Sequence, residues 1–506
     1  MNSTFQPGRL YNGAVPAYYL ENFGCRATQA DGASLERQLQ ARGFRRCESP
    51  AHADIVILNT CTVTAAADHD ARAAIRRAHR ENPESKVLVT GCYAQRAPEE
   101  LAALPGVAWV VGNSHKHLIA EMVPEIVAEI SPEIVSTPPA NFVGLETVRL
   151  SAPAFTLVGD IFAHTELVAA PVFEGETMAE KTRPNLKVQD GCDNRCSFCI
   201  IPSVRGQSRS MKLDRVIQEA NALVAAGYRE VVLSGINLGR WGRDFEPQHS
   251  FEAKPERFAE PQANRFVEPQ ANRFIDLLRA LLEHTDVQKI RISSVEPMDW
   301  SDELIRLVAE SPRIAKHAHL PLQSGSDRVL RRMHRKYRPW HYAEKIRTIR
   351  EAMPSAAIGA DVMVGFPGET DELFEESRSF IEHLPFTYLH VFTYSSRPGT
   401  PSAAMTDQVP VHIARERNRI LRDLAAAKNL DFRRSFIGRQ LGVITLHSAG
   451  ADWTEALSDN YLKVRVAGRH QANQLMRVDV MEASDEGLVA LAQEESVLAE
   501  CNELRL

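Results

Sequence analysis

Short apolar runs alternate with helical patterns along most of this chain of 506 residues. In the first part, the runs Ala17–Phe23, Asp54–Asn59 and Lys86–Thr90 predict strands, and Ser34–Arg42, Asp68–Arg80 and Pro98–Leu104 predict helices. Strands that are joined through helices pair in parallel, because a parallel pair needs a crossover connection. The alternation therefore predicts an N-terminal parallel-sheet α/β domain over residues 16–128.

The same alternation returns after Arg183 and predicts six strand–helix units. The predicted strands are Asn185–Val188, Glu230–Ser234, Lys289–Ser293, His317–Leu320, Ala357–Val364 and Tyr388–Thr393. Six units fall short of a complete barrel and predict a partial (βα)6 barrel over residues 178–430, with its chemistry at the carboxyl ends of the strands. The stretch from Ser131 to about Thr182 is expected to be linker and edge structure.

Two further segments depart from this alternation. From about Asp431, the β-like runs Leu441–Leu446, Tyr461–Val466 and Leu475–Val480 are separated by polar turns. They predict a small C-terminal β-barrel over residues 433–500. A tandem repeat inside the central domain, Phe258–Arg265 followed by Phe266–Arg273, is predicted to be an expanded surface loop.

Three cysteines, Cys192, Cys196 and Cys199, lie close together directly after a predicted strand. Their spacing fits one face of a helix, but Gly191 and Pro202 make the segment a loop. A zinc site normally needs four ligands, and no fourth Cys or His lies close in sequence. Iron–sulfur cubanes take thiolates at such spacing, and three thiolates leave one iron open to another ligand. The segment therefore predicts a catalytic iron–sulfur cluster.

Three other cysteines, Cys25, Cys61 and Cys92, each follow a predicted strand. Each alone would be read as a small buried hydrophobe. Loops after parallel strands lie along one edge of the sheet, where ligands bind, so the matching positions favour a second cluster. The remaining cysteines, Cys47 and Cys501, are predicted to have no functional role.

The spacing Cys-x3-Cys-x2-Cys, with Phe198 before the last cysteine, resembles the radical S-adenosylmethionine (SAM) signature. The resemblance implies that the open iron binds the amino and carboxylate groups of SAM, and that electron transfer cleaves SAM to methionine and a 5′-deoxyadenosyl radical. Later segments resemble the strand ends that bind SAM in this superfamily. The residues expected to position SAM are Gly235, Asn237, Glu296, Asp361 and Gly365, with Gly368 and Gln323 as further candidates.

The segments Asn59–Thr64 and Thr90–Gln95 resemble the N-terminal domain of the methylthiotransferase family, and the terminal barrel resembles its TRAM domain. The resemblance implies two 4Fe–4S clusters, each held by three cysteines. It makes Cys25, Cys61 and Cys92 the ligands of an auxiliary cluster that carries the sulfur to be inserted. Thr28 stands where the family commonly has Asn.

The sequence around Cys61, Cys92 and Gln189–Pro202 is similar to that of the bacterial branch of the family. This branch acts on N(6)-threonylcarbamoyladenosine at position 37 of tRNA, next to the anticodon. The implied reaction is addition of a methylthio group to C2 of this base, with one SAM methylating the sulfur and a second SAM supplying the radical. The alternatives are the same reaction on isopentenyladenosine in tRNA or on a ribosomal-protein aspartate. Alternatives of another class are a non-catalytic iron–sulfur protein that binds RNA or transfers electrons, and a zinc protein.

A formal net charge of −6 gives no global cationic field, so RNA contacts are expected from local basic patches. Most basic runs are solvated faces, but two of them stand out in an acidic chain. The candidate phosphate-binding residues are Arg72, Arg76 and Arg80 on one helix face, and Arg331, Arg332, Arg335 and Lys336 in the segment 328–338.

Arg205 and Arg209 follow the cysteine loop and are candidates to meet a phosphate or the carboxylate of the threonylcarbamoyl group. The terminal domain, from Arg433 onward, holds eight Lys and Arg against eleven Asp and Glu. We therefore expect the segment 328–338 to contribute more to tRNA affinity than the terminal domain does.

The resemblance implies tRNA, SAM, a flavodoxin- or ferredoxin-like reductant and a sulfur source as partners of a monomeric enzyme. No run approaches the ~18 apolar residues that a membrane span needs. The first residues, Met1 to Pro16, lack the apolar core of a secretory signal. The chain is therefore predicted to be cytoplasmic, with no membrane partner.

Overall fold

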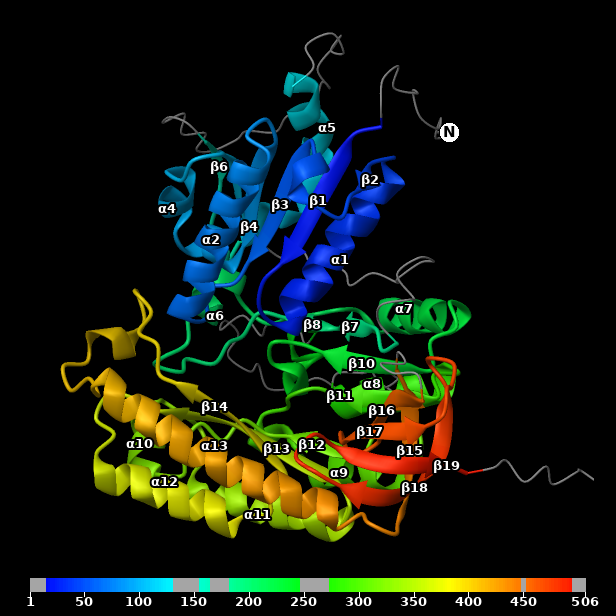
Figure 1. Cartoon of the computed structure of the whole chain (residues 1–506). Coiled ribbons are helices and arrows are strands. Elements are labelled where there is room, and N and C mark those ends of the chain that lie inside the picture. Colours follow the sequence, from blue (N-terminus) through cyan, green and yellow to red (C-terminus); the bar gives the residue numbers. More distant parts are fainter. Residues whose placement is uncertain (1–14, 131–153, 164–181, 246–272, 447–451, 494–506) are drawn as a thin grey trace, which may run out of the picture.

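The computed structural model describes residues 15–130, 154–163, 182–245, 273–446 and 452–493. The elements form three units in chain order, which run from blue to cyan, from green to orange, and in red in Figure 1. Most of the predicted linker, 131–182, and the predicted repeat loop, apart from Arg273, lie outside the described residues.

Six parallel strands form the N-terminal sheet, in the order β2-β1-β3-β4-β5-β6. They are β1 (Ala17–Asn22), β2 (Arg45–Arg46), β3 (Ile55–Thr60), β4 (Lys86–Gly91), β5 (Val107–Gly112) and β6 (Phe155–Leu157). The central strands β3 and β4 are nearly continuous runs of Ile, Val and Leu, as expected of strands that are covered on both faces. The three predicted strands are confirmed, and β2, β5 and β6 are added to them.

Helices cover both faces of this sheet. They are α1 (Arg26–Ala41), α2 (Ala65–Glu81), α3 (Cys92–Arg96), α4 (Pro98–Ala102) and α5 (Ile119–Ile130). Helices α1 and α5 pack on one face, and α2 and α4 pack on the other. Helix α1 begins well before the predicted Ser34, because its first turns bury Thr28 and Asp31, and these polar residues hide the apolar periodicity.

The central unit is a partial barrel of six parallel strands. They are β7 (Asn185–Lys187), β10 (Glu230–Ser234), β11 (Lys289–Ile292), β12 (His317–His319), β13 (Ala357–Val364) and β14 (Tyr388–Thr393). They pair as β11-β10-β7 and as β12-β13-β14, and a bridge between Ile290 and Ile314 links the two groups. In the described part of the chain no ladder joins β14 to β7, so the barrel is open on that side.

Amphipathic helices cover the outside of the partial barrel and share one large core with its strands. They are α7 (Leu213–Ala225), α8 (Phe274–His284), α9 (Asp302–Glu310), α10 (Asp327–Arg332), α11 (Pro339–Ala352), α12 (Asp371–His383) and α13 (Val411–Arg434). The short helix α6 (Ile201–Arg205) instead packs against Cys92 of the N-terminal unit. A short antiparallel pair, β8 (Gln189–Asp190) and β9 (Arg209–Ser210), flanks the loop that carries Cys192, Cys196 and Cys199. Helix α6 follows that loop directly.

The C-terminal unit is a closed barrel in the order β15-β16-β17-β19-β18. Its strands are β15 (Gln440–Thr445), β16 (Trp453–Ser458), β17 (Lys463–Ala467), β18 (Leu475–Ala483) and β19 (Leu488–Ala492). Arg291 donates to the carbonyls of Ser458 and Asp459, and Asn460 donates to the carbonyl of Ser355, just before β13. These contacts place the terminal barrel at the amino-terminal ends of the central strands, away from the cysteine loops (Figure 1).

The N-terminal unit packs along the β7 side of the central barrel and reaches the loop that follows β14 (Figure 1). Asn185, the first residue of β7, donates to the Arg26 carbonyl (3.0 Å), and Arg397, in the loop after β14, pairs with Asp68 of α2 (2.7 Å). Arg26 and Asp68 follow β1 and β3, so the carboxyl end of the N-terminal sheet faces the central barrel. None of the helices in the described residues is long and apolar enough to cross a membrane.

Candidate active site

Cys192, Cys196 and Cys199 lie in the loop between β8 and α6, and all three are partly buried. Burial raises the pKa of the Cys199 thiol to about 12. Burial also raises the pKa of the Cys192 thiol, and Cys196 adds to this effect in both cases. The mutual influence of the thiols shows that the loop brings them together.

Protein donors surround these sulfur atoms. The Asn194 amide and the Asn237 side chain donate to Cys192 Sγ, over 3.4 and 3.6 Å. Arg335 Nη1 donates to Cys196 Sγ over 3.2 Å, and Arg335 Nη2 pairs with Glu296. Donors of this kind stabilise the sulfur of bound clusters and tune their electronics.

Gln189 holds the cysteine loop in place through hydrogen bonds of its side-chain amide. Its amide nitrogen donates to the carbonyls of Asp190 and Gly191, and its amide oxygen accepts from the Asn237 backbone (2.7 Å). A Cβ at Gly235 would lie 2.9 Å from the same amide oxygen. The absence of a side chain at Gly235 therefore leaves room for the Gln189 clamp.

Cys25, Cys61 and Cys92 follow β1, β3 and β4, as predicted from the strand pattern. Cys61 and Cys92 are buried, and Cys25 is exposed at the N-cap of α1. Burial, then the neighbouring Cys92, raises the pKa of the Cys61 thiol to about 12, and Cys25 adds to this effect. Gly24 lies directly against Cys61, since a Cβ on it would be 2.8 Å from Cys61 Sγ. The three cysteines therefore converge at one edge of the sheet.

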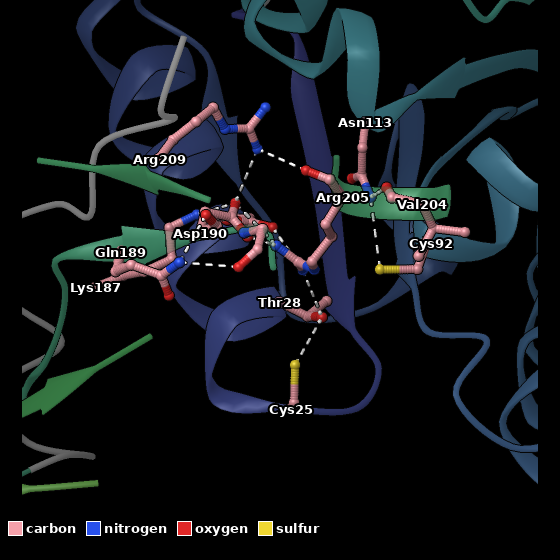
Figure 2. Close-up of polar contacts among 12 residues, drawn as sticks. Cys25, Thr28, Cys92, Asn113, Lys187, Gln189, Asp190, Val204, Arg205 and Arg209 are labelled. Carbon is pink, nitrogen blue, oxygen red and sulfur yellow. Dashed lines mark hydrogen bonds and ion pairs between the residues drawn. The ribbon is translucent and has the colours of Figure 1, made fainter. Parts of the chain in front are cut away.

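Two polar side chains, Asn113 and Thr28, contact this second set (Figure 2). Asn113, directly after β5, donates to Cys92 Sγ (3.5 Å) and to the Val204 carbonyl (2.8 Å). Thr28 lies 3.6 Å from Cys25 Sγ through its hydroxyl. Thr28 therefore lies beside a cysteine of the second set, although the family commonly has Asn at this position. Nothing in the sequence indicated the contact between Asn113 and Cys92.

Apolar side chains lie between Cys92 and the loop of the first cysteine set. Cys92 packs with Ile200 and Val204 in one small cluster, and Ile200 directly follows Cys199. The two sets therefore face each other across the interface between the N-terminal unit and the central barrel.

Both sets fit iron–sulfur clusters. Their buried thiols have raised pKa values, so the thiolates need a cationic partner to be stable there. Asn237 Oδ1 and Arg205 Nε are buried beside the cysteines without a partner among the described residues. No three His, Cys, Asp or Glu side chains in the described ranges are arranged to hold one metal ion. In a cubane each of three thiolates would bind a different iron, and each set supplies three cysteines.

The remaining SAM candidates differ in their surroundings. A cavity of about 200 Å³ opens beside Cys196 and is lined by Glu296, Arg335 and Tyr337, among others. Asp361, on β13, lies 3.4 Å from His319 Nε2 across the inside of the barrel. Glu296 therefore lies beside the cysteine loop, and Asp361 lies inside the barrel.

Three other candidates have structural surroundings that the sequence did not indicate. Gly365 (φ +74) is pressed against α13, since a Cβ there would lie 2.5 Å from Ala414 Cβ. A Cβ at Gly368 would lie 2.5 Å from Asp407 Oδ2. Both glycines thus lie close to other parts of the protein, and their approach to a cofactor stays a prediction. Gln323 has a left-handed backbone (φ 64), and its backbone N–H donates to the Asp361 carbonyl (2.8 Å).

The structure corrects the expectation for the two arginines after the cysteine loop. Arg205 is buried and pairs with Asp31 and Asp190, each at 3.0 Å, so it is not available to a phosphate or a substrate carboxylate. Arg209 donates to the Arg205 carbonyl (2.9 Å) and lies 3.8 Å from Asp190. Both arginines therefore make contacts inside the interface between the N-terminal unit and the central barrel.

The basic stripe on α2 lies partly on the surface. Arg76 and Arg80 are exposed, as phosphate contacts require, whereas Arg72 donates to the Tyr93 hydroxyl (2.6 Å). The sequence pattern identified the shared face but not the internal partner of Arg72.

The segment 328–338 is less available than predicted. Arg335 is buried at Cys196, so its role as a phosphate contact is corrected. Arg331 pairs with Asp327 (2.8 Å) and Arg332 pairs with Asp407 (2.7 Å), and Lys336 is exposed. Only part of the predicted basic patch therefore faces solvent.

Cys47 is buried, and its thiol donates to the Tyr18 carbonyl, in keeping with a packing role. Cys501 lies outside the described residues.

Comparison with known proteins agrees with this geometry. Two family models match the chain, the uncharacterized protein family UPF0004 over residues 17–112 and the radical SAM superfamily over residues 186–381. The radical SAM methyltransferase TsrM from Kitasatospora setae has a similar fold, with a TM-score of 0.53 at 16% identity over 77% of this chain and 75% of that one.

Curated relatives extend over nearly the whole chain. The threonylcarbamoyladenosine tRNA methylthiotransferase MtaB of Aquifex aeolicus is 33% identical over 90% of this chain and 98% of its own length. The protein of the same name from Bacillus subtilis is 34% identical over 91% and 92%. The tRNA-2-methylthio-N(6)-dimethylallyladenosine synthase of Thermobifida fusca is 31% identical over 92% and 83%. The chain therefore belongs to the radical SAM methylthiotransferase family and is a transferase similar to the MtaB-named members of that family.

Proposed function

We propose that this enzyme adds a methylthio group to C2 of N(6)-threonylcarbamoyladenosine beside the anticodon of tRNA. The names of the Aquifex and Bacillus relatives support this acceptor, while the name of the Thermobifida relative keeps the isopentenyl-type base as the rival. The observation that carries the reaction class is the second cysteine set, which faces the first across Ile200 and Val204.

The two sets of three cysteines would have different roles in the reaction. Cys192, Cys196 and Cys199 would hold the cluster that binds SAM, and Cys25, Cys61 and Cys92 would hold the auxiliary cluster. When bound, the first cluster supplies the electron that cleaves SAM, and the second carries the sulfur that is methylated and inserted.

The residues of the chain orient these groups and exclude water. Gln189 and Asn237 hold the Cys192 end of the loop, and Arg335 holds Cys196 while Glu296 fixes Arg335. Burial of Cys61 and Cys92 keeps solvent from the path between the two sites. Such enclosure protects a reactive radical from side reactions.

Arg26 is the residue best placed to recognise the carboxylate of the threonylcarbamoyl group. It follows Cys25 directly, is exposed, and forms no ion pair with the described residues. Burial, then His319, lowers the pKa of His390, and the charge of Arg26 contributes to the same effect. That charge therefore reaches β14, at the open side of the barrel. A guanidinium there would pair with a substrate carboxylate.

The proposal also requires a one-electron reductant of the flavodoxin or ferredoxin kind and a source of replacement sulfur. We propose further that the enzyme acts as a monomer, because both cysteine sets of one chain meet at one interface.

The test uses anaerobically reconstituted enzyme and anticodon stem-loops that carry either threonylcarbamoyladenosine or isopentenyladenosine. We expect methylthiolation of the first stem-loop, iron and sulfide for two clusters, and release of 5′-deoxyadenosine. Cys25→Ala should keep 5′-deoxyadenosine release and lose methylthiolation, whereas Cys192→Ala should lose both.

Preferential reaction of the isopentenyl stem-loop would move the enzyme to the rival branch. Intact clusters without 5′-deoxyadenosine would instead indicate a non-catalytic iron–sulfur protein.

A further inference from the structure

A buried charge network crosses the interface beside the auxiliary cysteines (Figure 2). The N-terminal unit contributes Asp31 from α1 and Lys116, and the central unit contributes Lys187, Asp190 and Arg205. Lys116 lies 3.1 Å from Asp31, and Lys187 pairs with both Asp31 and Asp190. The side chains of all five are at least nine-tenths buried.

The carboxylates of this network are ionised. Burial would raise the pKa of Asp31, but Lys116, Lys187 and Arg205 outweigh burial and hold that pKa well below its usual range. The same balance, with Arg205 as the main cation, lowers the pKa of Asp190. Arg205 itself stays protonated at any accessible pH. Two carboxylates are thus surrounded by three basic side chains.

Arg205 connects this network to sulfur. Its Nη2 donates to the Thr28 hydroxyl (3.3 Å), and that hydroxyl lies 3.6 Å from Cys25 Sγ. The charge of Arg205 also lowers the pKa of the Cys61 thiol, against the larger effect of burial. Arg205 Nε is buried and has no partner among the described residues. The guanidinium therefore lies near Cys25, through Thr28, and keeps an unused donor.

The position of Arg205 is fixed from both domains. Arg205 ends helix α6, which starts just after Cys199, and Nη1 pairs with Asp190, two residues before Cys192. Nη2 pairs with Asp31 on α1, the helix that Cys25 caps. The same arginine thus lies between the loop of one cysteine set and the helix of the other.

We propose that Arg205 is a positioning residue that supplies compensating positive charge, through Thr28 and directly, to the auxiliary cluster on Cys25, Cys61 and Cys92. The inference rests on the proposed cluster assignment. Three thiolates around an iron–sulfur core leave net negative charge, and a buried cation beside it favours the added electron of the reduced state. Arg205 therefore raises the reduction potential of this cluster.

The experiment isolates the auxiliary cluster in a protein that carries Cys192→Ala, Cys196→Ala and Cys199→Ala, reconstituted with iron and sulfide. The midpoint potential is measured by a redox titration followed by electron paramagnetic resonance. Arg205→Gln, added to this background, should weaken reduction about tenfold, which is a shift of about 59 mV to more negative potential for one electron. Arg205→Lys should retain most of the parental potential, because it keeps the charge.

Arg291→Gln is the matched control. Arg291 is equally buried, pairs with Glu230 (2.7 Å) and also bridges two domains, but it does so at the terminal barrel. Its replacement should leave the potential unchanged. Thr28→Val should give a smaller negative shift than Arg205→Gln, because it removes the bridging hydroxyl and keeps the cation.

Every result of this experiment either supports the role of Arg205 or overturns it. Loss of the cluster from Arg205→Gln but not from Arg205→Lys would also support it. A parental potential in Arg205→Gln, an equal shift in Arg291→Gln, or loss of the cluster from both Arg205 variants would overturn it and leave Arg205 a role in folding alone. If the background protein binds no iron, the cluster assignment itself fails, and this inference falls with it.

Discussion

At the scale of single residues, the surroundings of the cysteines decide more than the cysteines themselves. Arg26 and Arg205 both lie near Cys25, yet one is exposed without an ion pair and the other is buried between two carboxylates. The exposed arginine can meet a substrate, whereas the buried one can only act on its neighbours.

Replacing Arg26 with Gln should lower kcat/KM for the threonylcarbamoyladenosine stem-loop about ten- to hundredfold, because a hydrogen bond to a charged group contributes about 1.5–3 kcal/mol. A stem-loop whose threonylcarbamoyl carboxylate is methylated should lose little between parent and variant. Steady-state rates on both substrates provide the measurement. Arg37→Gln, on the outer part of α1 where Arg37 faces Glu219, is the control and should behave as the parent. Equal losses on the two substrates would count against carboxylate recognition.

The sequence pointed to all six cysteines and to Asn237, Glu296 and Arg335, but it indicated neither the contacts between them nor those that cross the domain interface. Asp31 meets Arg205 across 174 positions, and Asn113 meets Val204 across 91. Contacts between such distant segments depend on how two domains dock, and local patterns carry no information on docking.

At the scale of elements, the strand ends place the auxiliary cysteines, and the turn after β1 lies directly against one of them. Gly24 has φ +98 and lies so close to Cys61 that a Cβ would be 2.5 Å from Cys61 Cβ. A side chain there must displace Cys61 and also adopt a strained backbone.

Gly24→Ala should therefore reduce the iron content to that of one cluster and abolish methylthiolation, while 5′-deoxyadenosine is still released. Gly43→Ala is the matched control, since Gly43 has a similar φ of +84 but nothing within 4 Å of an added Cβ. Iron analysis and product assays of the two variants give the comparison. Full iron content in Gly24→Ala would show that the β1 turn does not constrain Cys61.

Elements with a clear apolar run or a clear helical period were predicted, whereas very short elements were not. Strands β10, β13 and β14 have the predicted bounds, because each is an apolar run between polar turns. Helix α3 has five residues, too few to show a period, and starts at Cys92 itself. Strand β5 begins at Val107, soon after α4 ends at Ala102, and no strand was predicted there.

At the scale of the whole molecule, the buried network joins the N-terminal unit to the central barrel. Removing one member of such a network leaves buried charges without compensation, which typically costs about 3–5 kcal/mol. Asp31 is the member that all three basic side chains share.

Asp31→Asn should accordingly lower the free energy of unfolding of the cluster-free protein by about 3–5 kcal/mol at neutral pH. Because the pKa of Asp31 is lower in the folded than in the unfolded protein, this stabilisation is complete above about pH 4, the usual range of an unfolded Asp, and declines as the pH falls below it. Urea unfolding followed by circular dichroism at pH 7 and at about pH 3.5 would measure the difference. Asp70→Asn, at an exposed site of the same unit, should have little effect at either pH. A difference that is constant or grows on acidification would contradict the ionised network.

The central claim concerns sulfur insertion into one modified base of tRNA, and nucleoside analysis tests it most directly. Total tRNA from cells with and without the gene would be digested and compared by mass spectrometry. We predict that 2-methylthio-N(6)-threonylcarbamoyladenosine disappears without the gene and that N(6)-threonylcarbamoyladenosine accumulates, with recovery by the parent gene but not by Cys25→Ala. Retention of that nucleoside, or loss of the methylthio-isopentenyl nucleoside in its place, would contradict the account.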